Sequence, residues 1–535
     1  MKRILSVLLA AALLVALFAA AAVAEQPKVL NWFIEGEVPT MDSTKVYDTL
    51  SGEGVYFFND TLYRLDNNSE PFPSLAVDLP EFSEDGKTVT ITIRDDAYWN
   101  NGDKITADDI VYAAQRLFDP AVGSQSTTGV QLKNRDAVRA GEMPVEALGI
   151  EAVSDTVVVL TLEAPDPYVT KKLADTAFSP ANRAFAEGLG EAYGLNADSL
   201  LASGAYVLKD WNGTDISWRY EKNPYFWDKD NVYFDEITIQ VVKDANTGIN
   251  LYEAGVLDAY RLPSDYVPTY EGQPDLVKVD SLTTTNIELG ISSSTVLQNE
   301  NIRKALMYAI DREEMASIVL NGAAAPLQAV IPNGAAASPD GQGINESFPN
   351  LVYYDLEAAQ AYFAKGLEEL GVDSVALRLV TSDTDDSIKV GTRLQSQLQD
   401  NLPGLTINLA NVPASVRFNE MMSFQFDLAL GGWTGEYDPT AYVKQFETSF
   451  EHNHAQWKSE ELTALVSALD NEDGTDFATR WEHLKEGSTY LIENAVVIPI
   501  YQRVDNYLVR PGLENYITRQ LGYTKFDLSR AYFAE

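Results

Sequence analysis

The chain has 535 residues, with 39 Lys and Arg against 79 Asp and Glu, so its formal net charge is −40, and it contains no cysteine. This excess of negative charge repels nucleic-acid phosphates and anionic lipid, which argues against both as partners. Without cysteine there is no disulfide, thiolate metal site, iron–sulfur cluster or cysteine nucleophile. Hydrophobic residues make up 45% of the chain, enough for packed cores, and the length predicts roughly two to four domains of about 100–200 residues each.

The first 24 residues have the pattern of a secretory signal peptide. A basic start, Met1–Arg3, precedes the apolar run Ile4–Ala22, and Ala22–Ala24 is an A-x-A site. We therefore expect cleavage after Ala24. An uncleaved membrane anchor is the alternative, because the run is close to spanning length. No other apolar stretch approaches that length, so we expect the mature protein to be soluble and outside the cytoplasm.

Strand and helix patterns alternate along the rest of the chain, which predicts an α/β protein in several lobes. Lys28–Phe33 is the first expected strand, and Thr88–Ile93 alternates strictly, as a half-buried strand does. The segment Trp99–Asp103 has turn chemistry, since Asn-Gly readily takes positive φ. Thr106 then caps an expected helix that ends before Pro120.

Further elements follow in chain order. The sequence predicts strands at Ile150–Val153, Thr156–Leu162, Ile237–Val242, Val375–Val380, Leu405–Leu409, Asp427–Leu430 and Val496–Tyr501. It predicts helices at Ala245–Ala254, Ile302–Ile310, Arg312–Leu320, Leu356–Leu370, Asp385–Gln399, Glu460–Asp470 and Phe477–Ile492. Gly255 and Gly371 lie where helix C-caps favour glycine. With no flexible linker between elements, we expect short strand crossings to join the lobes.

Motifs for catalysis or metal binding are scarce. The sequence has no G-x-S-x-G, H-E-x-x-H, P-loop or dinucleotide fingerprint. His452 and His454 offer two ring nitrogens, but nothing nearby in sequence completes a metal site, so we interpret this segment as a solvated polar loop. His483 lies in a helical pattern and indicates a packed or surface role. We therefore expect no catalytic residue, no metal and no cofactor.

The segment Gly432–Pro439, G-W-T-G-E-Y-D-P, combines features that suit ligand binding. It follows a short apolar strand, and its glycines allow another backbone to approach closely. Glu436 lies between two aromatic residues of this segment. This combination favours an extended ligand laid against the main chain, with an amine bound by the carboxylate.

Four motifs in chain order resemble family 5 of the solute-binding proteins of ABC importers, the oligopeptide- and dipeptide-binding proteins. They are T-I-T-I-R-D-D-A-Y-W-N-N-G-D-K-I-T-A-D-D-I-V-Y at 90–112, S-G-A-Y-V-L-K-D-W at 203–211, N-I-R-K-A-L-M-Y-A-I-D-R at 301–312 and the Gly432–Pro439 segment. The resemblance runs from about residue 28 to the C-terminus, so it covers nearly the whole mature chain.

The resemblance implies an α/β, three-lobed periplasmic-binding-protein-like fold of class II. Two lobes would close like a flytrap on the ligand, and an extra lobe on the N-terminal side would enlarge the cavity. The expected division, after a signal peptide at 1–24, is lobe I at 25–65, 164–282 and 505–535, extra lobe II at 66–163 and lobe III at 283–504.

The resemblance also implies which residues bind the ligand. A peptide would lie extended between the loop Asp42–Asp48 and the segment that follows Gly432. The expected ligand-binding residues are Lys45, Val46, Tyr47, Trp433, Thr434, Gly435, Glu436, Tyr437 and Asp438. Glu436 takes the place of the family aspartate that binds the peptide amine. Leu430 and Gly431 stand where peptide binders that hold the ligand C-terminus often carry a base, so recognition by that route is absent.

The expected function is that of an extracytoplasmic, monomeric receptor that delivers peptides to a membrane permease. It is not a Cys-anchored lipoprotein, because no cysteine follows the signal peptide. The acidic chain favours basic peptides. Two alternatives stay open: the same fold binding an oligosaccharide, an opine-like compound or another amine, and, more remotely, a secreted hydrolase with paired carboxylates.

Overall fold

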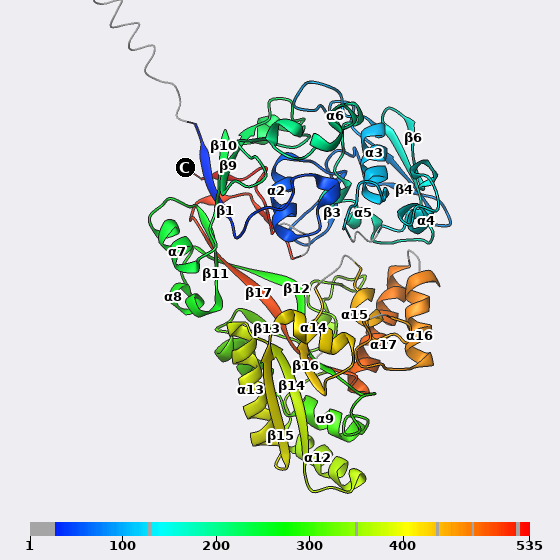
Figure 1. Ribbon diagram of the computed structural model, residues 1–535, viewed down its shortest axis with the longest axis vertical. Coiled ribbons are helices and arrows are strands. Elements are labelled where there is room, and N and C mark those ends of the chain that lie inside the picture. Colours follow the sequence, from blue (N-terminus) through cyan, green and yellow to red (C-terminus); the bar gives the residue numbers. More distant parts are fainter. Residues whose placement is uncertain are drawn as a thin grey trace, which may run out of the picture.

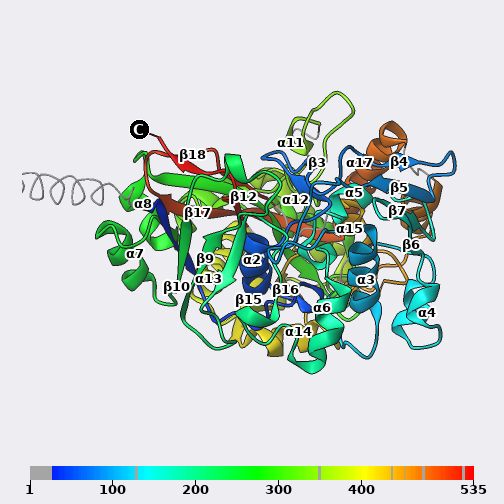
Figure 2. The same ribbon diagram turned by 90° about the horizontal axis from the view of Figure 1, so that it is seen from above.

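The computed structural model describes residues 27–126, 130–347, 351–434, 438–450, 452–472, 476–520 and 525–534. An upper and a lower body are joined by long strands (Figure 1). Seen from above, β9 and β10 lie toward one end of the molecule and α3 and β6 toward the other (Figure 2). Within the described ranges, no helix is both long enough and apolar enough to cross a bilayer.

One part of the upper body is built on a four-stranded sheet in the order β1-β10-β9-β8. The first strand runs parallel to β10, and the other pairs are antiparallel. The elements are β1 Val29–Ile34, α2 Thr49–Phe58, β8 Tyr206–Lys209, β9 Ser217–Lys222, β10 Glu236–Val241, α7 Ala245–Glu253 and α8 Val267–Tyr270. Their core also takes in residues from the C-terminal segment, since the Trp32 ring lies 5.2 Å from that of Phe526.

The other part of the upper body is an antiparallel sheet in the order β4-β5-β7-β6, packed against α3. The elements are β2 Tyr63–Leu65, β3 Pro71–Pro73, β4 Glu81–Phe82, β5 Thr88–Thr92, α3 Ala107–Phe118, α4 Arg135–Arg139, β6 Ile150–Ser154, β7 Val157–Thr161, α5 Val169–Lys172 and α6 Arg183–Leu189. Asp109 accepts a 2.8 Å bond from the Thr106 N–H, so the predicted helix start is confirmed.

The lower body surrounds most of a mixed sheet in the order β11-β17-β12-β16-β14-β15, whose β13 pairs with β17 and whose β11 packs in the core of the upper body. Its strands are β11 Ala259–Leu262, β12 Leu276–Leu289, β13 Ala324–Pro326, β14 Val375–Ser382, β15 Leu405–Val412, β16 Leu428–Gly431 and β17 Val497–Val509. Its helices include α9 Glu300–Tyr308, α10 Arg312–Glu314, α11 Ile344–Ser347, α12 Leu356–Leu370, α13 Asp385–Asn401, α14 Ala414–Met422, α15 Thr440–Lys444, α16 Glu460–Ser467 and α17 Phe477–Glu493.

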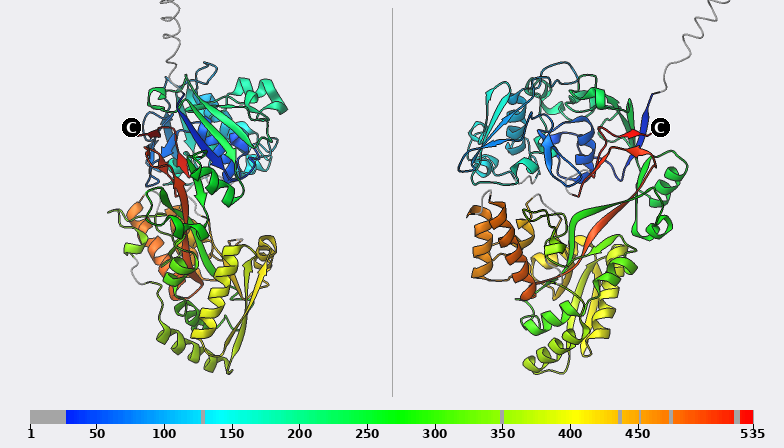
Figure 3. Two further views of the ribbon diagram at one scale, coloured as in Figure 1. Left: turned by 90° about the vertical axis from the view of Figure 1, so that its left-hand side faces the viewer. Right: turned by 180° about the vertical axis from the view of Figure 1, so that it is seen from behind.

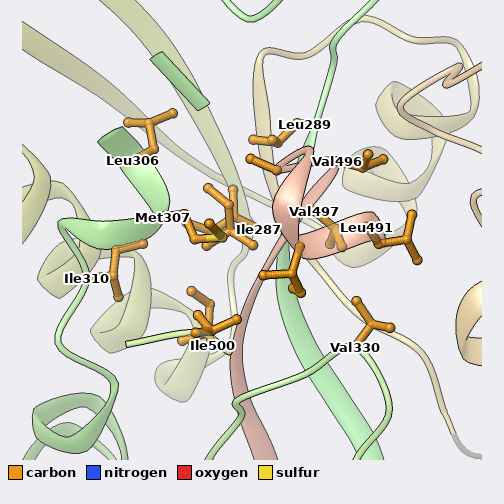
Figure 4. Packing of buried hydrophobic residues seen from close by; sticks show 14 of the residues in the cluster. Ile287, Leu289, Leu306, Met307, Ile310, Val330, Leu491, Val496, Val497 and Ile500 are labelled. Atoms are coloured by element: carbon orange, nitrogen blue, oxygen red, sulfur yellow. The ribbon is translucent and has the colours of Figure 1, made fainter. Parts of the chain in front are cut away.

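The two bodies are connected by β12 and β17, which pair antiparallel over most of their length. The 14 residues of β12 and the 13 of β17 reach from one core into the other, as the side view shows (Figure 3). Ile287 of β12 and Val497 and Ile500 of β17 pack with α9 in the lower core (Figure 4). The same two strands therefore belong to two hydrophobic cores.

Short strand pairs close the C-terminal part of the chain. They are β18 Leu513–Glu514 with β21 Tyr532–Phe533, and β19 Ile517–Thr518 with β20 Phe526–Asp527. Asp527 accepts bonds of 2.9 Å from Arg64 and from Tyr56 on α2. Arg519 lies 3.6 Å from the same carboxylate. These charges tie the end of the chain to its beginning.

The structure confirms the α/β class and the helices and strands predicted above, with three local differences. The strand predicted at Val496–Tyr501 is β17, which extends further, to Val509. The helix predicted over Arg312–Leu320 is α10 followed by a π-helical turn at Met315–Val319. Likewise α16 continues into a π-helical turn at Ala468–Glu472. Gly255 and Gly371 have φ of 72° and 68°, as their C-cap positions require. The lobe boundaries given above stay a prediction.

Replacing Asp527 by asparagine should lower the free energy of unfolding by about 3–5 kcal/mol, because Arg64 and Arg519 would be left buried without their shared carboxylate. Although burial opposes it, the two arginines hold the pKa of Asp527 well below its ordinary 3.8. This contribution is therefore complete above about pH 4 and is lost as the pH falls through the folded-state pKa. Urea unfolding at pH 7 and at pH 3 measures it.

The matched control is Asp136→Asn, since that carboxylate is 82% exposed. It should change stability by less than about 0.5 kcal/mol. Equal effects of the two variants would contradict the role given to the Asp527 cluster.

Candidate ligand-binding site

The segment that begins at Gly432 continues the pairing of β16 with β12. The Thr284 N–H donates to the Trp433 carbonyl oxygen at 2.9 Å, and the Trp433 N–H donates to Thr284 Oγ1 at 3.2 Å. Gly431 is paired with Asn286 one step earlier in the same register. Trp433 therefore directs its backbone groups toward β12.

Gly432 directs its backbone N–H and C=O to the opposite side, because these groups point to alternate sides in successive residues of a strand. The strand on that side, β14, pairs with β16 only at Leu428 and Ala429. Among the described residues, the Gly432 N–H and C=O have no hydrogen-bond partner. The segment thus presents an open strand edge, to which an extended chain can add main-chain hydrogen bonds.

No side chain fits at Gly432. A Cβ atom there would lie 1.9 Å from the Thr284 carbonyl oxygen. Trp433 packs partly against the lower core, and its ring lies 5.9 Å from that of Phe450. The close approach of Gly432 to β12 therefore fixes where the open edge lies.

The other end of the segment is fixed by Arg480 of α17. Its Nη2 donates to both carboxylate oxygens of Asp438, at 2.8 and 2.9 Å, and to Thr440 Oγ1 at 2.6 Å. Burial opposes ionisation of Asp438, but Arg480 and Lys172 hold its pKa below the ordinary value. Both ends of the segment are thus held by side chains of the lower body. At the second end, the charge of Lys172 of the upper body also lowers the pKa of Asp438.

A cavity of about 420 Å³ lies between the two bodies beside this end of the segment. The upper body lines it with Asp166 and Lys172, and the lower body lines it with Asp438, Lys444 and Arg480. Beside it, the guanidinium of Arg480 lies 5.3 Å from the Tyr168 ring centre. Burial and the nearby Asp438 raise the pKa of Tyr168 to about 12, so its hydroxyl is neutral at physiological pH.

The predicted residues of the upper body lie between a short 3₁₀ turn, Ser43–Lys45, and α2. Val46 is fully buried, whereas Tyr47 is 50% exposed and Lys45 is also exposed. Because the Val46 side chain belongs to the core, only its backbone is offered to a ligand. Among the described residues, no hydrogen bond or ion pair joins Lys45–Tyr47 to the lower-body segment.

The structure brings Trp433, Thr434 and Asp438 into one segment of the lower body, whereas Lys45, Val46 and Tyr47 belong to the upper body (Figure 1). Gly435, Glu436 and Tyr437 lie outside the described residues. The part of the site assigned to these three stays a prediction.

The interpretation of His452–His454 as a solvated polar loop is wrong. His454 is 9% exposed, and its Nδ1 is bonded to the buried carboxylate of Glu288 on β12. Asn453 is also buried and donates to the carbonyl oxygens of Glu447 and Trp457. The long strand β12, which the sequence pattern did not reveal, supplies the missing partner. Within the described ranges, no three His, Asp or Glu side chains are grouped to hold a metal ion.

Sequence reasoning also missed Arg417 of α14. Its Nη1 donates to the Leu430 carbonyl oxygen at 2.8 Å, and its Nε donates to Ser382 Oγ at 3.0 Å. The guanidinium therefore lies where β16 passes into the open edge. No local pattern signals this, because the two residues meet only through the packing of α14 against the sheet.

Comparison with known proteins shows the family to which the chain belongs. The sequence model of the family described as bacterial extracellular solute-binding proteins, family 5 Middle, matches residues 70–453. The dipeptide-binding protein of Lactococcus lactis is 30% identical over 523 residues, covering 95% of this chain and 94% of that protein. The oligopeptide-binding protein OppA of Bacillus subtilis is 29% identical over 521 residues, covering 94% and 92%.

Among solved structures, Listeria monocytogenes OppA bound to peptide superposes with a TM-score of 0.72 at 32% identity, covering 96% of this chain and all of that one. The chain belongs to family 5 of the bacterial extracellular solute-binding proteins. The predicted family and its multi-lobed binding-protein fold are thereby confirmed.

Replacing Gly432 by alanine should destabilise the protein by about 1–3 kcal/mol and displace the open edge, because the added methyl group meets the Thr284 carbonyl. Thermal unfolding measures the first effect and ligand titration the second. Gly188 of α6 is the matched control, since a Cβ there meets nothing within 4 Å. Gly188→Ala should be neutral or stabilising by up to about 1 kcal/mol. Unchanged stability and binding in Gly432→Ala would refute the steric argument.

Proposed function

We propose that this protein is an extracytoplasmic receptor of an ABC importer that binds peptides between its two bodies and delivers them to a membrane permease. The observation that carries the proposal is the open strand edge at Gly432, fixed by Thr284 at one end and by Arg480 at the other. The relatives support it, because they include proteins named as dipeptide- and oligopeptide-binding proteins and a structure with bound peptide.

Main-chain hydrogen bonds at this edge would bind peptides with little regard to their side chains, each contributing about 0.5–1.5 kcal/mol net. In the proposal, Lys45, Val46 and Tyr47 of the upper body form one wall of the site, and Trp433–Asp438 of the lower body form the other. Glu436 binds the ligand's amino group, a charge-assisted contact of about 1.5–3 kcal/mol. Specificity is then loose for side chains and firm for the free amine.

Closure would bend β12 and β17, the strands that the two bodies share. The register of their pairing shifts between Asp280 and Thr284, and such a bulge locally weakens a ladder. In the proposal the receptor works as a monomer, without cofactor and without turnover of its ligand. It reaches the cell exterior through a signal peptide at 1–24, and lobes I, II and III have the boundaries given above.

Isothermal titration with free and N-acetylated tri- and tetrapeptides tests the function. The wild type should bind free peptides, and acetylation should weaken binding about ten- to a hundredfold. Glu436→Gln should weaken binding of free peptides to the same degree and leave acetylated ones unchanged. Glu187→Gln, on exposed α6, removes the same charge far from the site and should have no effect.

Equal affinity for acetylated and free peptides would show that Glu436 does not bind the ligand's amino group. Binding of oligosaccharides but of no peptide would overturn the proposed ligand class. Turnover of a reporter glycoside that is lost on substitution of one carboxylate would instead identify a hydrolase.

A further inference from the structure

The upper-body wall of the proposed site, Lys45–Tyr47, begins in a short 3₁₀ turn, Ser43–Lys45, that Asp42 caps. Asp42 Oδ1 accepts from the Thr44 N–H at 3.2 Å and from Thr44 Oγ1 at 2.8 Å. The Asp42 carbonyl oxygen accepts from the Lys45 N–H at 2.9 Å. Asp42 therefore fixes the turn through both its side chain and its backbone.

The residues that follow this turn offer backbone groups to a ligand. Among the described residues, the N–H of Tyr47 and the carbonyl oxygens of Val46 and Tyr47 have no hydrogen-bond partner. The Val46 side chain is fully buried and Tyr47 is 50% exposed, so the chain passes here from the core to the surface. These free groups are the counterpart of the free N–H and C=O of Gly432 on the other wall, and the turn before them sets their position.

The second carboxylate oxygen of Asp42 binds an arginine from a different part of the upper body. Arg116 of α3 donates to Asp42 Oδ2 at 2.7 Å, and the two side chains are only 14% and 3% exposed. By contrast, the pair of Arg183 with Asp108 at the start of α3 is 35% and 53% exposed. Loss of one partner from a buried pair leaves the other charge uncompensated, whereas water solvates the remaining charge of an exposed pair.

This ion pair joins two hydrophobic cores. Val46 belongs to the core that contains β1 and β10, whereas Ile110 and Leu117 of α3 belong to the core that contains β5 and β7. The turn also packs directly on α3 and on the segment Thr176–Phe178. One part of the upper body thus supplies the wall of the proposed site, and the other part holds it.

The surroundings leave the ion pair little freedom. The guanidinium of Arg116 lies 4.7 Å from the Tyr193 ring centre and 5.9 Å from that of Tyr112. A Cβ atom at Gly194 would lie 2.9 Å from the Asp42 Cβ. Within the described ranges, no other cation lies within 4.0 Å of the Asp42 carboxylate. The place of Asp42 is therefore tied to that of Arg116.

We propose that Arg116 is a positioning residue of the binding site, which through Asp42 holds the segment Lys45–Tyr47 where a ligand chain pairs with it. This inference rests on the proposed function. Without Arg116, the buried carboxylate turns toward water and the turn loses its cap. The ligand then has to order the segment as it binds, and this lost conformational entropy weakens the affinity.

Titration calorimetry with free tri- and tetra-alanine tests the proposal. Arg116→Gln should weaken binding about ten- to a hundredfold, because the ligand then orders about one or two further residues. Arg116→Lys should retain part of the affinity, since it keeps the charge without the planar fork. Thr44→Val keeps the ion pair but removes one bond to Asp42, and it should weaken binding about three- to tenfold.

Arg303→Gln is the matched control. Arg303 is a buried arginine of the lower core, 3% exposed, that donates to the carbonyl oxygens of four residues. Its replacement should lower the unfolding temperature and leave unchanged the affinity measured well below that temperature. Thermal unfolding of all four variants establishes that each is folded.

Hydrogen exchange without ligand separates positioning from a general loss of stability. In Arg116→Gln, the amides of residues 42–48 should exchange at least about tenfold faster than in the wild type. The Asn59 amide at the end of α2, bonded to the Val55 carbonyl oxygen at 3.0 Å, should exchange at its wild-type rate. An equal increase at both places would contradict the inference, because the upper body as a whole is then less stable.

The binding outcomes are distinct. Unchanged affinity in Arg116→Gln overturns the inference and leaves the proposed function standing; if that variant does not fold, unchanged affinity in Thr44→Val overturns it instead. An equal loss of affinity in Arg303→Gln also overturns it, because lower stability then explains the effect. Failure of the wild type to bind either peptide overturns the proposed function, and the inference with it.

Discussion

The antiparallel pairing of β12 with β17 is the interaction on which the rest of the molecule depends. These strands contribute to two cores, and the Thr284 backbone of β12 also holds Trp433 through a 2.9 Å hydrogen bond. At the bulge beside it, the Leu282 carbonyl accepts from Tyr442 of α15 and its N–H donates to the Gln520 carbonyl at 3.2 Å. One ladder thus connects the bodies and sets the position of the open strand edge at Gly432.

Regular patterns allowed much of the fold to be predicted from the sequence. Thr88–Ile93 alternates because one face of β5 is buried, and Leu356–Leu370 repeats with helical period because one face of α12 packs on α9. The strand β12 escaped prediction because its middle, Ser281–Asn286, is almost wholly polar. Those residues bond to neighbouring segments of the fold, which no local pattern records.

The candidate site likewise has a part that the local sequence indicates and a part that it does not. The sequence singles out the segment after Gly432, because its glycines, aromatic residues and carboxylates form a recognisable local motif, and the role of this segment in binding stays a prediction. The residues that hold or complete it come from distant elements: Thr284 from β12, Arg480 from α17 and Arg417 from α14. The total charge of −40 gave no indication of this, since the cations beside the segment are placed by packing and not by composition.

The junction of the two chain ends has a consequence for biogenesis. Trp32 of β1 packs on Phe526, and Asp527 binds Arg64 and Tyr56. The core of the first strand is therefore incomplete until the last residues of the chain have been made. Contacts so distant in sequence form slowly. The chain therefore completes its native N-terminal core only after its synthesis has ended.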